Sequence, residues 1–146
     1  MANATAQATE ARAKQSSASK AATLDLLKGK SRAKETFSIY LTGESGKEQE
    51  VTLTYQAIGA LEYDKLVAKH PPKADQRVDG ASFNIDTFAP ALIAKVCVNP
   101  EMTEEDALEI WNSPEWSRGD LMVLFRHAVE LNNRGVDIPF TGSASG

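Results

Sequence analysis

Apolar and polar residues alternate along two short stretches in the first half of the chain. In residues 34–41, Phe37, Ile39 and Leu41 alternate with polar side chains, and residues 49–55 alternate in the same way. Period-two alternation with β-branched and aromatic residues is typical of half-buried strands. The segment between them, T-G-E-S-G-K-E-Q, has two glycines and no large apolar residue. The pattern therefore predicts a β-hairpin with one face on the core. An alternative role for its edge strand is pairing with a neighbouring subunit.

From residue 55 the apolar spacing becomes helical. A first helix is expected over residues 55–70, with Pro71-Pro72 ending it. The polar segment 71–82 is expected to be a loop, used for binding or simply mobile.

The densest apolar run is F-N-I-D-T-F-A-P-A-L-I-A-K-V-C-V, residues 83–98, and it predicts a helix buried on most sides. Asp86 or Thr87 is the expected N-cap, which puts Pro90 near the first turn, where a missing N–H costs little. Asn99-Pro100 is expected to end this helix.

Two further helix starts follow, each a hydroxyl residue with an acid three positions later. Thr103 with Asp106, and Ser117 with Asp120, both fit an N-cap pattern. The last helix carries one apolar stripe, made of Leu121, Leu124, Phe125, Ala128 and Leu131.

These elements predict an α+β fold of one hairpin followed by a bundle of about four helices. The single domain is expected to span residues 34–135, with the hairpin at 34–55 and the helices at 56–135. Residues 1–33 are expected to be a flexible basic arm, disordered over 1–20, with a short helix over 21–28 that Gly29 ends. Residues 136–146 are expected to be a flexible tail.

The net charge of −4 is unevenly distributed. Residues 1–34 carry seven basic and two acidic side chains, whereas the remainder carries nine basic and eighteen acidic ones. The basic arm is either a solubilising segment or a binder of an acidic partner or nucleic acid. Because no aromatic residue precedes Phe37, the arm has no platform for base stacking, and nucleic acid is the less favoured partner.

Composition indicates the cellular compartment in which the protein is expected to act. No run approaches ~18 apolar residues, so no membrane span is expected, and the N-terminus lacks the apolar core of a secretory signal. The single cysteine, Cys97, excludes an internal disulfide and suits a reducing cytoplasm.

No catalytic signature stands out. Cys97 is flanked by valines and is expected to be an inert core thiol, and His70 and His127 lack metal-ligand spacing with it. His127 is expected to be a surface residue. The sequence predicts no enzyme, no cofactor and no metal.

Exposed apolar residues late in the chain are the candidates for binding a partner. These are Trp111, Trp116, Met122 and Phe125. Two alternatives remain open, since the tryptophans could instead pack the corner at Ser113-Pro114, and core packing explains Phe125 equally well.

The second half of the chain also resembles a known family. The segments that carry the resemblance are H-P-P, F-N-I-D-T-F-A-P-A-L-I-A, N-P-E-M-T-E-E-D-A and L-N-N-R-G, within Ala57 to Gly135. They are similar to the tail assembly chaperones of long-tailed phages, above all those that infect actinobacterial hosts.

This resemblance implies a protein that binds the tape measure protein, keeps it soluble and helps tail tube subunits assemble around it. It also implies a longer form made by programmed frameshift, action in the host cytoplasm, and absence from the finished virion. Homo-oligomerisation is a further possibility. The alternative is a structural tail or connector protein of the virion, which the helical second half argues against.

Overall fold

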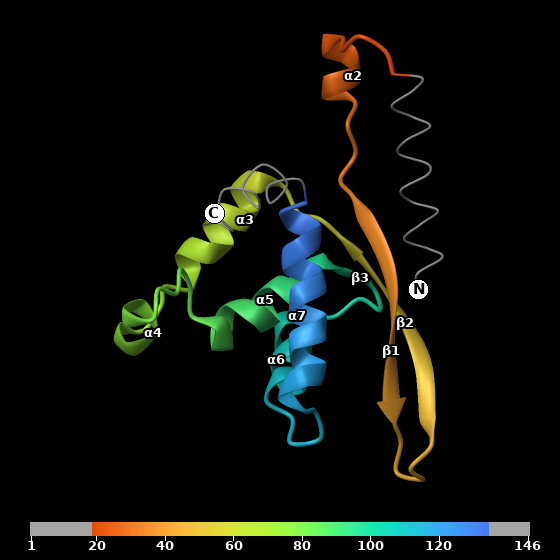
Figure 1. The fold of residues 1–146 in the computed structure, drawn as a ribbon, viewed down its shortest axis with the longest axis vertical. Helices are drawn as coiled ribbons and strands as arrows, with labels where there is room; N and C mark the ends of the chain where they lie inside the picture. The colour runs from red at the N-terminus through yellow and green to blue at the C-terminus, as the bar shows by residue number, and fades with distance from the viewer. Residues whose placement is uncertain (1–18, 135–146) are drawn as a thin grey trace, which may run out of the picture. The chain divides into compact units, whose positions relative to one another are not determined.

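The computed structural model describes residues 19–134 (Figure 1). The expected disorder of residues 1–18 and the flexible tail at 136–146 lie outside the described residues. The chain divides into two compact units, with the boundary after Ser31, and the two are described separately below.

The first unit contains one short helix, α2 (Leu24–Lys28). Thr23 caps it, because its hydroxyl accepts the backbone N–H of Leu26 at 3.2 Å, and Gly29 ends it. The predicted helix is therefore confirmed in its C-terminal part. None of its residues is buried.

The second unit begins with the predicted hairpin, formed by β1 (Lys34–Thr42) and β2 (Glu48–Gln56). The antiparallel register pairs Phe37 with Leu53 and Ile39 with Val51, so the alternating apolar residues share one face. The helices of this unit lie on one side of the hairpin (Figure 1). The predicted α+β fold class is thus confirmed.

A third strand, β3 (Cys97–Asn99), pairs antiparallel with the end of β2 and gives the strand order β1-β2-β3. The expectation that the central helix continues through residue 98 is wrong. Asn99 precedes a proline and so disfavours helical backbone, and the open edge of β2 supplies hydrogen-bond partners for an extended segment.

Four of the five helices in this unit match the predicted ones. They are α3 (Ala60–Lys69), α5 (Ile85–Val96), α6 (Glu104–Trp111) and α7 (Arg118–Asn132). The fifth, α4 (Ala74–Val78), occupies the segment expected to be a loop. Its start is held by the Gln76 side chain, which accepts the N–H of Lys73 at 2.8 Å. Because α4 buries no residue, it lacks the apolar stripe by which helices are predicted.

Helix α5 is the centre of the second unit and contacts α3, α6, α7 and β3. Its N-cap is Asn84 rather than Asp86 or Thr87, so Pro90 lies inside the helix, a correction to the expected start. Phe83, just before the cap, packs on Phe88 with ring centroids 4.4 Å apart, as in a hydrophobic staple. Pro90 leaves the carbonyl of Asp86 without its helical donor, which Asp86 tolerates because it is exposed.

The two later helix starts are confirmed. At α6 the Thr103 hydroxyl accepts the N–H of Asp106 at 3.1 Å, and the Asp106 carboxylate accepts the N–H of Thr103 at 2.9 Å. At α7 the Ser117 hydroxyl accepts the N–H of Asp120 at 3.1 Å. Within residues 19–134, no helix has the length and apolar character needed to cross a membrane.

Candidate functional site

The two tryptophans lie on one apolar groove. Trp111 ends α6 and is only 4% exposed, and Trp116 is half-buried in the loop before α7. The Trp111 ring meets Phe125 edge-on at a centroid distance of 6.3 Å, and the Arg118 guanidinium lies 5.4 Å from the centre of the same ring. These two residues are the only tryptophans in the chain.

Met122 and Phe125 do not line this groove. Phe125 is 6% exposed and belongs to the core, and Met122 is a half-buried residue packed against that core. The expectation of exposed contact surface is therefore wrong for Trp111 and Phe125. Whether any of the four residues binds a partner stays a prediction.

We call the hollow that Trp111 and Trp116 line the apolar groove, and its volume is about 430 Å³. Its walls come from the far half of the hairpin, the loop after β3, α6, the loop after α6 and the first turns of α7. Its main apolar lining residues are Ile39, Leu41, Val51, Pro100, Met102, Ile110, Trp111, Trp116, Leu121 and Leu124. Thr52 and Asn99 are the polar residues among those that line it.

The groove exists because the hairpin extends farther than the helices that cover it. Toward the open end of the hairpin, where β1 begins and β2 ends, Phe37 stacks on His127 of α7. There the Tyr55 hydroxyl also donates to the carbonyl of Leu124 at 3.1 Å. Farther along the same face, Ile39 is half-buried and Leu41 is 37% exposed. Apolar strand residues thus continue past the point where α7 buries them, and they form one wall of the groove.

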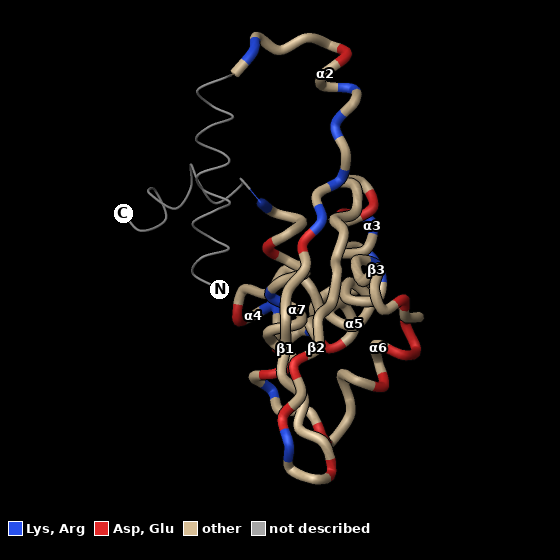
Figure 2. Tube along the Cα trace, turned by 90° about the vertical axis from the view of Figure 1, so that its right-hand side faces the viewer, with Lys and Arg blue, Asp and Glu red and all other residues tan. Residues whose placement is uncertain are grey.

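Acidic groups lie beside the groove. A neighbouring hollow that shares Ile39 and Trp116 with it also contains Glu48 and Asp120. A further hollow, which shares Met102 with the groove, contains Glu104 together with Lys95. Figure 2 shows acidic residues gathered at α6 and along the far part of the hairpin. The surroundings of the groove therefore favour an apolar partner that carries basic flanks.

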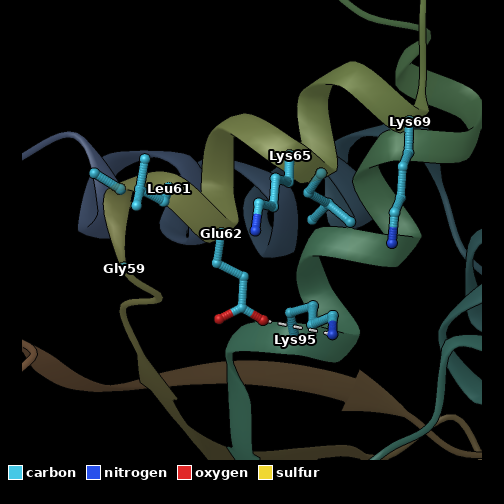
Figure 3. Close-up of a pocket in the computed structure, with 8 residues that line it drawn as sticks. Gly59, Leu61, Glu62, Lys65, Lys69 and Lys95 are labelled. Carbon is cyan, nitrogen blue, oxygen red and sulfur yellow. Dashed lines mark ion pairs between the residues drawn. The ribbon is translucent and has the colours of Figure 1, made fainter.

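A second hollow of about 680 Å³ lies between α3 and α5 (Figure 3). Lys65 and Lys69 extend from α3 toward α5, and Glu62 pairs with Lys95 across the gap at 3.5 Å. Both partners of this pair are 51% exposed, so the pair contributes little to stability. Four of the eight residues that line this hollow are charged, and all four are exposed to solvent, so the apolar groove is the better candidate site.

Cys97 is buried at the start of β3, as the sequence predicts for a core thiol. Its Sγ donates to the carbonyl of Pro100 at 3.0 Å. Burial raises the pKa of the thiol, which disfavours the nucleophilic thiolate. Among residues 19–134, no group of three or more His, Cys, Asp or Glu side chains is placed to hold a metal ion.

His127 has a structural role that sequence reasoning missed. Its Nδ1 lies 2.7 Å from the Glu35 carboxylate, and its ring stacks on Phe37 at a centroid distance of 3.8 Å. Arg134 donates to the other oxygen of Glu35 at 3.0 Å. Glu35 thus ties β1 to α7 and the residues after it. No local pattern signals this cluster, because its members are 92 and 99 positions apart.

The fold and the groove together define a small α+β domain with an open apolar groove. Comparison of the chain with family models, curated proteins and solved structures finds no match.

Proposed function

We propose that this protein is a tail assembly chaperone of a long-tailed phage. In this proposal the apolar groove binds an apolar segment of the tape measure protein and keeps that protein soluble until tail tube subunits enclose it. The protein acts in the host cytoplasm and leaves before the virion is complete.

The observation that carries this proposal is the groove itself. A hollow of about 430 Å³ lined by two tryptophans and by aliphatic side chains is large enough for several apolar side chains of a partner. A half-buried tryptophan beside a pocket is a typical anchor of a protein interface. Apolar residues spaced along one face of a helix are the segments that such grooves bind, and a long helical tape measure chain supplies many of them. The tape measure protein is proposed as the partner because the second half of the chain resembles the tail assembly chaperones.

The acidic body gives the second part of the mechanism. Acidic side chains around α6 and the hairpin face solvent. Copies bound along one apolar chain would give the complex a net negative charge, since each chain carries −4. Like charge keeps such particles apart and in solution.

Co-expression with the tape measure protein tests the proposal. Wild-type protein is expected to keep the tape measure protein in the soluble fraction, and Leu41→Ser combined with Trp116→Ser is expected to lose most of this effect. In direct titration, the remaining Trp111 fluorescence reports binding, and the affinity of the double variant is expected to fall by roughly tenfold or more.

The matched control is Leu61→Ser, because Leu61 is 76% exposed on α3 and lies away from the apolar groove. It is expected to behave as the wild type. Equal solubilisation by a correctly folded Leu41/Trp116 variant would contradict the role of the groove. Stoichiometric amounts of the protein in purified virions would instead favour the structural virion protein.

A further inference from the structure

The described part of the first unit, from residue 19 on, presents apolar side chains that are exposed to solvent. Leu24, Leu26 and Leu27 of α2 are 64%, 57% and 65% exposed. A five-residue helix is too short to be stable through its own hydrogen bonds, so packing on another surface would be its main source of stability. We call residues 19–33 the leucine arm.

The leucine arm is also basic. It carries four basic side chains (Lys20, Lys28, Lys30 and Arg32) against one acidic side chain, Asp25. Figure 2 shows this excess of Lys and Arg on both sides of α2. The arm is therefore an apolar helix with basic flanks.

The apolar groove has the complementary character. Its walls are aliphatic and aromatic, and Glu48, Asp120 and Glu104 lie in the hollows beside it. The basic side chains that accompany it are Lys95 and Arg118, and Arg118 is placed over the Trp111 ring. Among these neighbouring groups the acidic side chains are the more numerous. Such a rim attracts basic flanks while the walls accept leucines.

We propose that the leucine arm of one copy docks in the apolar groove of a second copy of this chain. The leucines of α2 fill the space beside Trp116 and Leu41, and the basic residues of the arm face the acidic rim. The protein thus associates with itself by exchanging arms.

The length of the connection favours a second copy over the same chain. Residues 29–33 join α2 to β1, and five residues span at most ~18 Å. The direction of β1 is set at its base, where the N–H of Ala57 donates to the carbonyl of Ala33 at 2.8 Å.

The groove's strand wall begins at Leu53, opposite Phe37, and reaches Leu41, so it lies three to seven residues along β1 from Lys34, which is roughly 10–23 Å. An arm that folded back to its own groove would need a turn of about four residues. Too few residues would then remain to cover that distance.

Arm exchange does not depend on the identity of the partner that the groove binds during function. If the groove binds the tape measure protein, the arm of a second copy covers the groove beforehand and is displaced on binding. If the proposed function fails, the exchange can still be observed, because its test uses this protein alone.

Light scattering coupled to size-exclusion chromatography of the full chain tests the exchange. Wild-type protein is expected to have the mass of a dimer or larger. Leu24→Ser with Leu27→Ser in the arm, and Leu41→Lys in the groove, are each expected to give monomers. The control Leu61→Ser is expected to keep the wild-type mass. The arm variant changes only exposed residues, so a failure to fold does not confound it.

Mixing the two variants gives the decisive result. The arm variant retains an intact groove and the groove variant retains an intact arm, so the mixture is expected to form a one-to-one heterodimer that high salt weakens. A monomeric wild type, or an arm variant that keeps the wild-type mass, would overturn the proposal. A monomer whose tryptophan fluorescence changes when the arm is altered would also overturn it, since the arm would then lie on its own groove.

Discussion

Tyr55 shows how one residue joins the two halves of the second unit. It is fully buried, and its hydroxyl donates to the carbonyl of Leu124 at 3.1 Å, which connects β2 to α7. Phe37 packs against its ring edge-on at 4.7 Å. Burial, followed by the nearby Cys97 and Glu35, raises the pKa of this phenol well above its ordinary value of 10.0. The alternating pattern predicts that Tyr55 faces the core, but its partner 69 positions away comes only from the fold.

The raised pKa of Tyr55 predicts a loss of stability at alkaline pH. Below pH 10 the phenol is neutral in both the folded and the unfolded chain, so its contribution is complete. Above pH 10 the unfolded chain releases the proton and the folded chain retains it, so the free energy of unfolding falls by up to ~1.4 kcal/mol per pH unit. Urea unfolding between pH 9 and pH 11 is expected to show a steeper fall for the wild type than for Tyr55→Phe. Parallel curves for the two proteins would contradict this.

At the scale of single elements, two helix N-caps follow from the local sequence and one does not. The N-caps Thr103 and Ser117 are predicted correctly because neither has a competing capping residue next to it at the start of its helix. At α5, Asn84, Asp86 and Thr87 are all good capping residues, and the pattern does not choose among them. In the folded protein the N-cap is Asn84, which is 8% exposed. Its side-chain oxygen accepts the N–H of Asp86 at 3.2 Å and the side-chain amide of Gln76 at 3.1 Å.

Replacement of Asn84 is therefore expected to weaken the start of α5. Asn84→Ala removes the acceptor of both donors and is expected to lower the free energy of unfolding by about 1–2 kcal/mol. Asn84→Ser is the control, because its hydroxyl can still cap the helix, and it is expected to lose less. Urea unfolding followed by circular dichroism measures both. An alanine variant as stable as the serine variant would show that the cap contributes nothing.

At the scale of the whole molecule, α5 is the buried spine that the apolar run predicts. Helices α3, α6 and α7 and strand β3 all contact it, and Phe88, Leu92 and Val96 are fully buried. The helices and the sheet share this one core. Damage to α5 is therefore expected to affect the whole second unit rather than one element.

Leu92→Ala is expected to lower the free energy of unfolding by about 2–5 kcal/mol, because it leaves a cavity among all the elements that touch α5. The matched control is Leu61→Ala, whose side chain is 76% exposed, and it is expected to change stability by less than about 0.5 kcal/mol. Urea unfolding followed by circular dichroism measures both. A similar small change in the two variants would show that α5 is not the common core.

The sequence by itself determined the hairpin and the alternation that gives it one apolar face, four helices of the second unit, two of the helix caps and the separation of a basic arm from an acidic body. These features depend on near neighbours, since alternation, helical spacing and capping act over a few residues. The tertiary structure alone decided the pairing of β3 with β2, the N-cap of α5 and the cluster around Glu35.

It also decided the groove, whose walls combine Leu41 of the hairpin with Trp111 and Trp116. A groove is apolar surface that the rest of the molecule leaves uncovered, so it depends on where every element ends. The leucines of α2, by contrast, are evident in the sequence. Their exposure and the matching groove are what make an exchange between copies testable.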